Sequence, residues 1–176
     1  MSDISSRNFG LLIAYLIPGF ILIWGLGQWS PDVAAWLAGA DGAGPTIGGF
    51  LIISVASIAA GMTASAIRWA LIDTIHHATG LTRPQWRDVF LHERIKAYQW
   101  LVENHYRYYQ FHANSLIALI IAHVFWRIST PFGPSSSWWI DASFVFIDVV
   151  FFLTSRNTLE RYYRRTADLL SDATSD

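Results

Sequence analysis

The chain has 176 residues, of which 53% are hydrophobic and only 14% are charged, and its formal net charge is −1. A soluble domain usually carries about 25% charged residues, so the low charged fraction is the first sign of a lipid-facing surface. The chain contains no cysteine, which excludes disulfides and thiolate metal sites.

Four apolar stretches approach the roughly 20 residues that a helix needs to cross a membrane. In chain order they cover residues 9–26, 46–67, 106–126 and 138–154. They predict an all-α polytopic membrane protein with a single domain over residues 1–176. The expected architecture is a four-span antiparallel transmembrane helix bundle.

The first stretch is interpreted as a retained span rather than a cleaved signal peptide. Its apolar run is longer than that of a signal peptide, and the acidic Asp3 precedes it. Pro18 and Gly19 lie near its middle, where proline removes one backbone hydrogen bond and predicts a kink. Ser30 and Pro31 then have the residue types of an N-cap and a first helical position, and they predict a short helix after the span.

The second stretch contains Ser57, Gly61 and Ser65, which repeat every four residues. Small residues at this spacing predict close helix packing. The helical pattern continues past the apolar run to Gly80, a natural C-terminal stop. The third and fourth stretches also have polar helical extensions. Residues 68–105 and 155–172 are therefore predicted to form a cytoplasmic helical collar.

Basic residues are distributed unequally between the two sides of the predicted spans. Arg127 alone lies on one side, and the other eleven basic residues lie on the opposite side. The positive-inside rule then predicts a multi-pass protein of the inner (plasma) membrane with both termini in the cytoplasm. The eleven residues are Arg7, Arg68, Arg83, Arg87, Arg94, Lys96, Arg107, Arg156, Arg161, Arg164 and Arg165.

Polar residues inside the apolar stretches are the main candidates for function, because an ionised aspartate in a bilayer normally faces a partner or a wet cavity. Counting helix turns places Asp141 at the depth of His123, near the outer ends of the last two spans. The same count places four polar side chains in the inner half of the membrane, where they are expected to converge: Asp148, Asn114, Tyr15 and Ser57. Two roles remain open for this cluster, a structural one that joins helices and an ion- or proton-binding one.

The sequence contains no P-loop, no G-x-S-x-G and no H-E-x-x-H motif. Asp73 and His77 lie four residues apart on one helical face and are the only weak candidates for metal ligands. No cofactor and no catalytic residue is therefore predicted. The acidic residues of the collar dilute its positive charge, so anionic lipid headgroups are a simpler partner than nucleic acid.

The leading functional hypothesis is a homo-oligomeric channel or pore-like effector, because one bundle of this size has no room for a continuous pore. The alternative is a membrane scaffold or regulatory subunit that recruits a cytosolic protein through the collar. A membrane-embedded metalloenzyme ranks third.

Overall fold

The computed structural model describes residues 2–39, 47–85, 89–130 and 138–171, and these residues form helices and connecting segments without a strand. Thr46, the first residue of the second predicted span, lies outside the described residues. The helices, including two short π-helices (η1 and η2), are α1 (Ser2–Trp29), α2 (Pro31–Ala38), α3 (Ile47–Arg68), η1 (Trp69–Asp73), α4 (Thr74–Ala78), α5 (Val89–Glu93), α6 (Ile95–Leu101), η2 (Val102–Tyr106), α7 (Arg107–Ser129) and α8 (Trp138–Leu170).

Among the described residues, four continuous helical stretches are long and apolar enough to cross a membrane, as the sequence predicts: Leu12–Trp29, Ile47–Ala78, Ile95–Ser129 and Trp138–Leu170. The predicted short helix is also confirmed. It is α2, and the Ser30 hydroxyl accepts a hydrogen bond from the Val33 backbone N–H at 3.4 Å.

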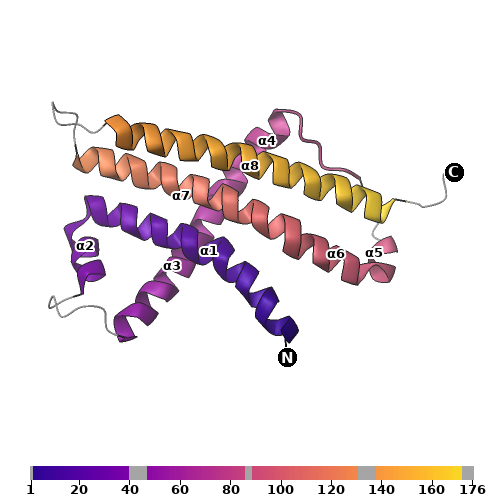
Figure 1. Cartoon of the computed structure of the whole chain (residues 1–176), viewed down its shortest axis with the longest axis horizontal. Coiled ribbons are helices and arrows are strands. Elements are labelled where there is room, and N and C mark those ends of the chain that lie inside the picture. Colours follow the sequence, from indigo (N-terminus) through magenta and orange to yellow (C-terminus); the bar gives the residue numbers. More distant parts are fainter. Residues whose placement is uncertain (1, 40–46, 86–88, 131–137, 172–176) are drawn as a thin grey trace.

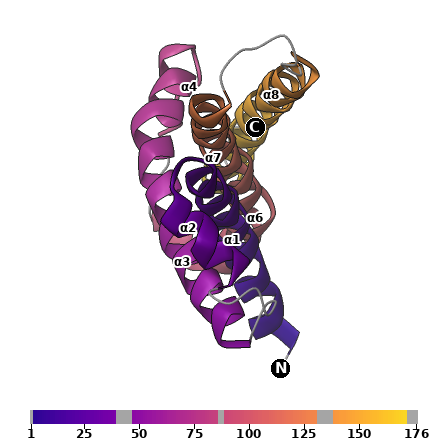
Figure 2. The ribbon, with the colours of Figure 1, turned by 90° about the vertical axis from the view of Figure 1, so that its left-hand side faces the viewer.

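Helices α8, α7 and α1 lie side by side, and α3 crosses the α1–α7 pair obliquely (Figures 1 and 2). Beyond the apolar part of α3, η1 and α4 continue the helix to α8. There, His76 of α4 contacts Ser155. The buried core is concentrated where these helices meet and contains Leu22, Ala64, Ile72, Tyr109, Leu116 and Leu159.

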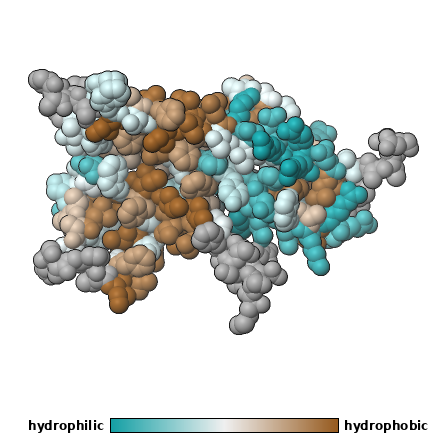
Figure 3. All heavy atoms as spheres, in the orientation of Figure 1, coloured by the Kyte–Doolittle hydropathy of each residue, from teal (hydrophilic) through white to brown (hydrophobic). Residues whose placement is uncertain are grey.

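The molecule has a hydrophobic part and a hydrophilic end (Figure 3). The hydrophilic end comprises α6 and the C-terminal half of α8. The N-terminal end of α1 is directed toward this end of the molecule (Figure 1). The apolar halves of α3 and α8 leave large side chains exposed, among them Phe50, Val55, Met62, Phe146 and Leu153. Such faces are typical of helices that contact lipid or another copy of the chain.

Helices α1 and α3 approach closely enough for their backbones to touch. A Cβ added at Gly61 would overlap the Tyr15 carbonyl oxygen, and one added at Gly19 would overlap the carbonyl oxygen of Ser57. Ser57 itself is fully buried, whereas Ser65, one repeat further on, is half-buried. Glycine at positions 19 and 61 is therefore what permits this crossing.

Pro18 lies buried inside α1, which stays helical on both sides of it and changes direction along its length (Figure 1). Proline has no N–H, so the Ala14 carbonyl one turn earlier loses its partner within the helix. The Asn114 side-chain amide of α7 donates a hydrogen bond to this carbonyl at 2.9 Å. The polar side chain of one helix thus satisfies the backbone group that the proline leaves unpaired.

Candidate functional site

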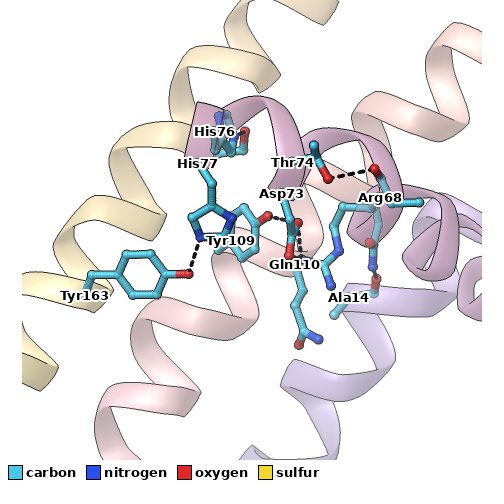
Figure 4. Close-up of polar contacts among 12 residues, drawn as sticks. Ala14, Arg68, Asp73, Thr74, His76, His77, Tyr109, Gln110 and Tyr163 are labelled. Atoms are coloured by element: carbon cyan, nitrogen blue, oxygen red, sulfur yellow. Dashed lines mark hydrogen bonds and ion pairs between the residues drawn. The ribbon is translucent and has the colours of Figure 1, made fainter. Parts of the chain in front are cut away.

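A charged network joins η1 and the end of α3 to α7 (Figure 4). Arg68 Nη1 lies 3.1 Å from Asp73 Oδ1, and the Tyr109 hydroxyl donates a hydrogen bond to the same carboxylate. The Arg68 guanidinium also lies over the Tyr109 ring, 5.0 Å from its centroid. Arg68 is only 4% exposed, and Tyr109 is fully buried. The ion pair is thus largely removed from solvent. A buried ion pair is stable only when further hydrogen bonds satisfy its charged groups.

The π-helix η1 brings the two charged residues of this network together. Arg68 immediately precedes η1 and Asp73 ends it, five residues later. In a π-helix the repeating hydrogen bond joins residues five apart, so these two side chains fall on the same side. π-helical turns inside longer helices occur frequently at functional sites. A second π-helix, η2, directly precedes α7, the helix that carries Tyr109.

Two histidines of α4 join this network to α8. His77 Nε2 lies 3.0 Å from the Tyr163 hydroxyl, with the two rings stacked, and His76 Nε2 lies 3.0 Å from Ser155 Oγ. The single Ser155 hydroxyl hydrogen is directed to the Phe152 carbonyl at 2.8 Å, so His76 Nε2 is the donor in its contact. His76 Nδ1 is then a buried acceptor with no hydrogen-bond partner among the described residues.

A further histidine, His105, joins η2 to α8 in the hydrophilic part of the molecule. Burial, and then the positive charges of Arg165 and Arg161, lower the pKa of His105 below its ordinary value. The neutral ring accepts a hydrogen bond from Arg165 Nη1 at 2.7 Å.

At the end of the α7–α8 contact that lies away from the hydrophilic part of the molecule, Asp141 contacts two residues of α7. His123 Nε2 lies 2.8 Å from Asp141 Oδ1, so the two residues matched by depth in the sequence are adjacent in space. Arg127 Nε donates to the same oxygen at 2.5 Å, and a second guanidinium nitrogen pairs with the other oxygen. The sequence reasoning missed Arg127, although it follows His123 by four residues on the same helical face.

The four polar residues expected to converge deeper in the spans are only partly brought together. Asn114 faces α1 through its bond to Ala14, and the Tyr15 hydroxyl accepts a hydrogen bond from Gln110 at 3.2 Å. Ser57 lies at the backbone contact between α1 and α3. These three therefore surround the meeting point of α1, α3 and α7.

Asp148 lies apart from them, on the side of α8 that faces α7. It is half-buried and interacts electrostatically with His123. Its Oδ1 atom is buried without a hydrogen-bond partner in the described part of the chain. His112 of α7 has a similarly unpartnered, buried Nδ1, and its ring packs 5.6 Å from that of Phe151 on α8. We call Asp141, His123, Asp148 and His112 the polar seam.

The two weak metal candidates engage different partners. Asp73 binds Arg68 and Tyr109, and His77 contacts Tyr163. Within the described ranges, no three or more His, Cys, Asp or Glu side chains are grouped as metal ligands. The arrangement therefore favours polar bridging between helices at these positions.

Comparisons of this chain with protein families, with curated proteins and with solved structures find no match.

Proposed function

We propose that the chain is an integral inner-membrane protein that crosses the bilayer four times with both termini in the cytoplasm. Four sufficiently long apolar helices support the crossing. The grouping of eleven of the twelve basic residues on one side supports the orientation. In this placement the hydrophilic end is a cytoplasmic collar next to anionic lipid headgroups.

Within the membrane, the protein acts as a homo-oligomeric channel or pore-like effector. The observation that carries this proposal is the polar seam, which places titratable side chains at successive levels between α7 and α8. Asp148 Oδ1 and His112 Nδ1 are buried and lack partners among the described residues. Ionisable groups at such depth are costly and mark ion or proton pathways. The exposed apolar faces of α3 and α8 are the surfaces on which further copies pack.

Ion flux into vesicles tests this function directly. Purified protein in phospholipid vesicles is expected to pass protons or potassium ions well above the rate of protein-free vesicles. Asp148→Asn should change that flux severalfold, or shift its pH dependence, because it removes the titratable carboxylate of the polar seam. Asp168→Asn is the matched control, since Asp168 is an exposed carboxylate in the hydrophilic part of the same helix.

Two results would contradict the channel. One is a wild-type flux no greater than that of empty vesicles over the whole pH range. The other is a monomeric mass in mild detergent, because the core of one chain is filled by side chains. If Asp148→Asn lowers only oligomer stability and leaves flux per oligomer unchanged, Asp148 is a structural residue.

A second function, a membrane scaffold or regulatory subunit, is favoured by a pocket at the hydrophilic end. The segment after α4 and the C-terminal half of α8 form this open pocket, which is lined by Leu81, Pro84, Arg156, Tyr163 and Arg164. The two arginines of the pocket outnumber its one acidic residue, Glu160, and together with Tyr163 they suit an acidic segment of a cytosolic protein. A stoichiometric partner that is captured by the wild type and lost with Arg164→Glu, together with no ion flux, would establish the scaffold in place of the channel.

A further inference from the structure

A second pocket lies where the beginning of α1 meets α6, η2 and α7. Its wall includes Gly10, Ile13, Trp100, Glu103, Arg107 and Phe111. The lining changes character along α7 and the helices that precede it. Trp100 and Glu103 belong to the hydrophilic part, whereas Ile13 and Phe111 belong to the apolar part. The pocket therefore crosses the boundary at which lipid headgroups would lie.

The side chain of Arg107 is built into this pocket. A Cβ on residue 10 would lie 2.8 Å from Arg107 Cδ, so the bare glycine leaves the space that the arginine stem occupies. Arg107 Nε is buried and has no hydrogen-bond partner among the described residues. An arginine with an unsatisfied N–H in a pocket suits phosphate, which accepts strong charge-assisted hydrogen bonds from a guanidinium.

We propose that this pocket binds one phospholipid, with the headgroup phosphate at Arg107 and the start of an acyl chain along Ile13 and Phe111. The proposal rests on the membrane insertion proposed above and does not depend on ion conduction. Trp100 is 54% exposed, and its amphipathic ring has the character that favours the headgroup level of a bilayer. The order of polar and apolar residues along the pocket matches the order of headgroup and chain in a phospholipid.

Glu103 selects among headgroups. Its carboxylate lines the same pocket as Arg107, so the site presents both signs of charge. A primary ammonium next to the phosphate is complementary to the carboxylate, whereas the uncharged glycerol of phosphatidylglycerol brings no positive charge to it. Phosphatidylethanolamine is therefore preferred over phosphatidylglycerol. Phosphatidylcholine, whose ammonium cannot donate a hydrogen bond, is intermediate.

Native mass spectrometry of the full chain in mild detergent tests the site with these three lipids added separately. Wild type is expected to retain one phosphatidylethanolamine per chain. Arg107→Gln should weaken this retention about tenfold or more, as expected for loss of a charge-assisted contact. Glu103→Gln should reduce or reverse the preference over phosphatidylglycerol. The control variant Arg164→Gln removes an arginine outside this pocket and should retain lipid like wild type.

A second variant, Ile13→Trp, fills the apolar end of the pocket and should also prevent retention while circular dichroism shows wild-type helicity. Unchanged retention in both Arg107→Gln and Ile13→Trp would overturn the site. Equal retention of all three lipids would overturn the selection by Glu103. Displacement of the lipid by millimolar inorganic phosphate would show a free-anion site instead. Ion flux is measured separately, so a wild type that passes ions but retains no phospholipid refutes the pocket and leaves the channel standing.

Discussion

Asn114 of α7 is a buried polar residue whose hydrogen bond is needed because of Pro18 in α1. Its amide satisfies the Ala14 carbonyl that Pro18 leaves without a partner. Pro18→Ala would restore the missing N–H, and the carbonyl would then no longer require Asn114. The two positions are therefore energetically coupled although they lie on different helices.

This coupling can be measured as a double-mutant cycle. Asn114→Ala alone should lower the free energy of unfolding by about 1–2 kcal/mol, because it leaves a buried acceptor unsatisfied. In the Pro18→Ala background the same change should cost about 1 kcal/mol less. The measurement is unfolding in mixed detergent micelles followed by circular dichroism. Equal costs in the two backgrounds would mean that the carbonyl does not need Asn114.

Asp73 neutralises a guanidinium that has little access to water. Asp73→Ala should destabilise the protein by about 3 kcal/mol, because it leaves Arg68 buried without its counter-charge and removes the acceptor of the Tyr109 hydroxyl. The double variant Arg68→Met/Asp73→Ala should lose less, since no uncompensated charge remains. The same unfolding measurement checks both, with Asp168→Ala as the exposed-carboxylate control. A double variant less stable than the single one would contradict this account.

Sequence reasoning was informative about depth and uninformative about direction. Helix rise alone placed Asp141 beside His123, and the two are adjacent. The same count matched Asp148 with Asn114, but Asn114 faces α1 while Asp148 faces α7. Depth follows from the number of residues per turn, whereas the direction of a side chain depends on how neighbouring helices are rotated and on which helices are neighbours.

At the scale of helices, the contact between α1 and α3 is the most sensitive to added volume. Gly61→Ala places a methyl group onto the Tyr15 carbonyl, and the two backbones must separate. We expect a loss of more than about 2 kcal/mol, which is typical of overpacking in a tight contact. Thermal unfolding in detergent measures it.

Gly48 provides the matched control in the same helix. A Cβ at this position meets nothing within 4 Å, so Gly48→Ala should be neutral or stabilising by up to about 1 kcal/mol through helix propensity. Similar losses for the two variants would show that α1 and α3 are not held by the close approach at Gly61.

The extents of the long helices could be predicted, whereas the π-helices could not. Apolar runs and their polar continuations predicted helices that continue to Gly80 and to about residue 172, and the described helices end close to these positions, at Ala78 and Leu170. Arg68 and Asp73 are five residues apart, a spacing that does not pair side chains on an ordinary α-helix. Only the local widening in η1 makes them neighbours, and the residues Trp69–Asp73 contain no glycine or proline to signal it.

At the scale of the whole molecule, the orientation in the membrane can be tested with single cysteines, because the chain contains none. Thr130 and Asp168 are both exposed and lie toward opposite ends of the described structure. In intact spheroplasts, a membrane-impermeant maleimide should label Thr130→Cys, and it should label Asp168→Cys only after lysis. The expected contrast follows from placing the eleven basic residues on the cytoplasmic side.

The cysteine-free wild type gives the background of this labelling. Labelling of Asp168→Cys but not of Thr130→Cys before lysis would invert the orientation. Labelling of both would contradict a membrane between the two ends. The inverted pattern would place the Asp141 end of the polar seam on the cytoplasmic side and reverse the direction of any conduction.

The repair of α1 by Asn114 also sets an order for biogenesis. Asn114 lies 100 residues after Ala14 in the chain, so α1 is synthesised long before its missing donor exists. In the proposed membrane placement an unpaired carbonyl in hydrocarbon costs several kcal/mol, so the newly made α1 is incompletely hydrogen-bonded until its donor is synthesised. The hydrogen bonding of α1 becomes complete only after α7 has been synthesised and has packed against it. The final conformation of the first apolar helix therefore depends on the third.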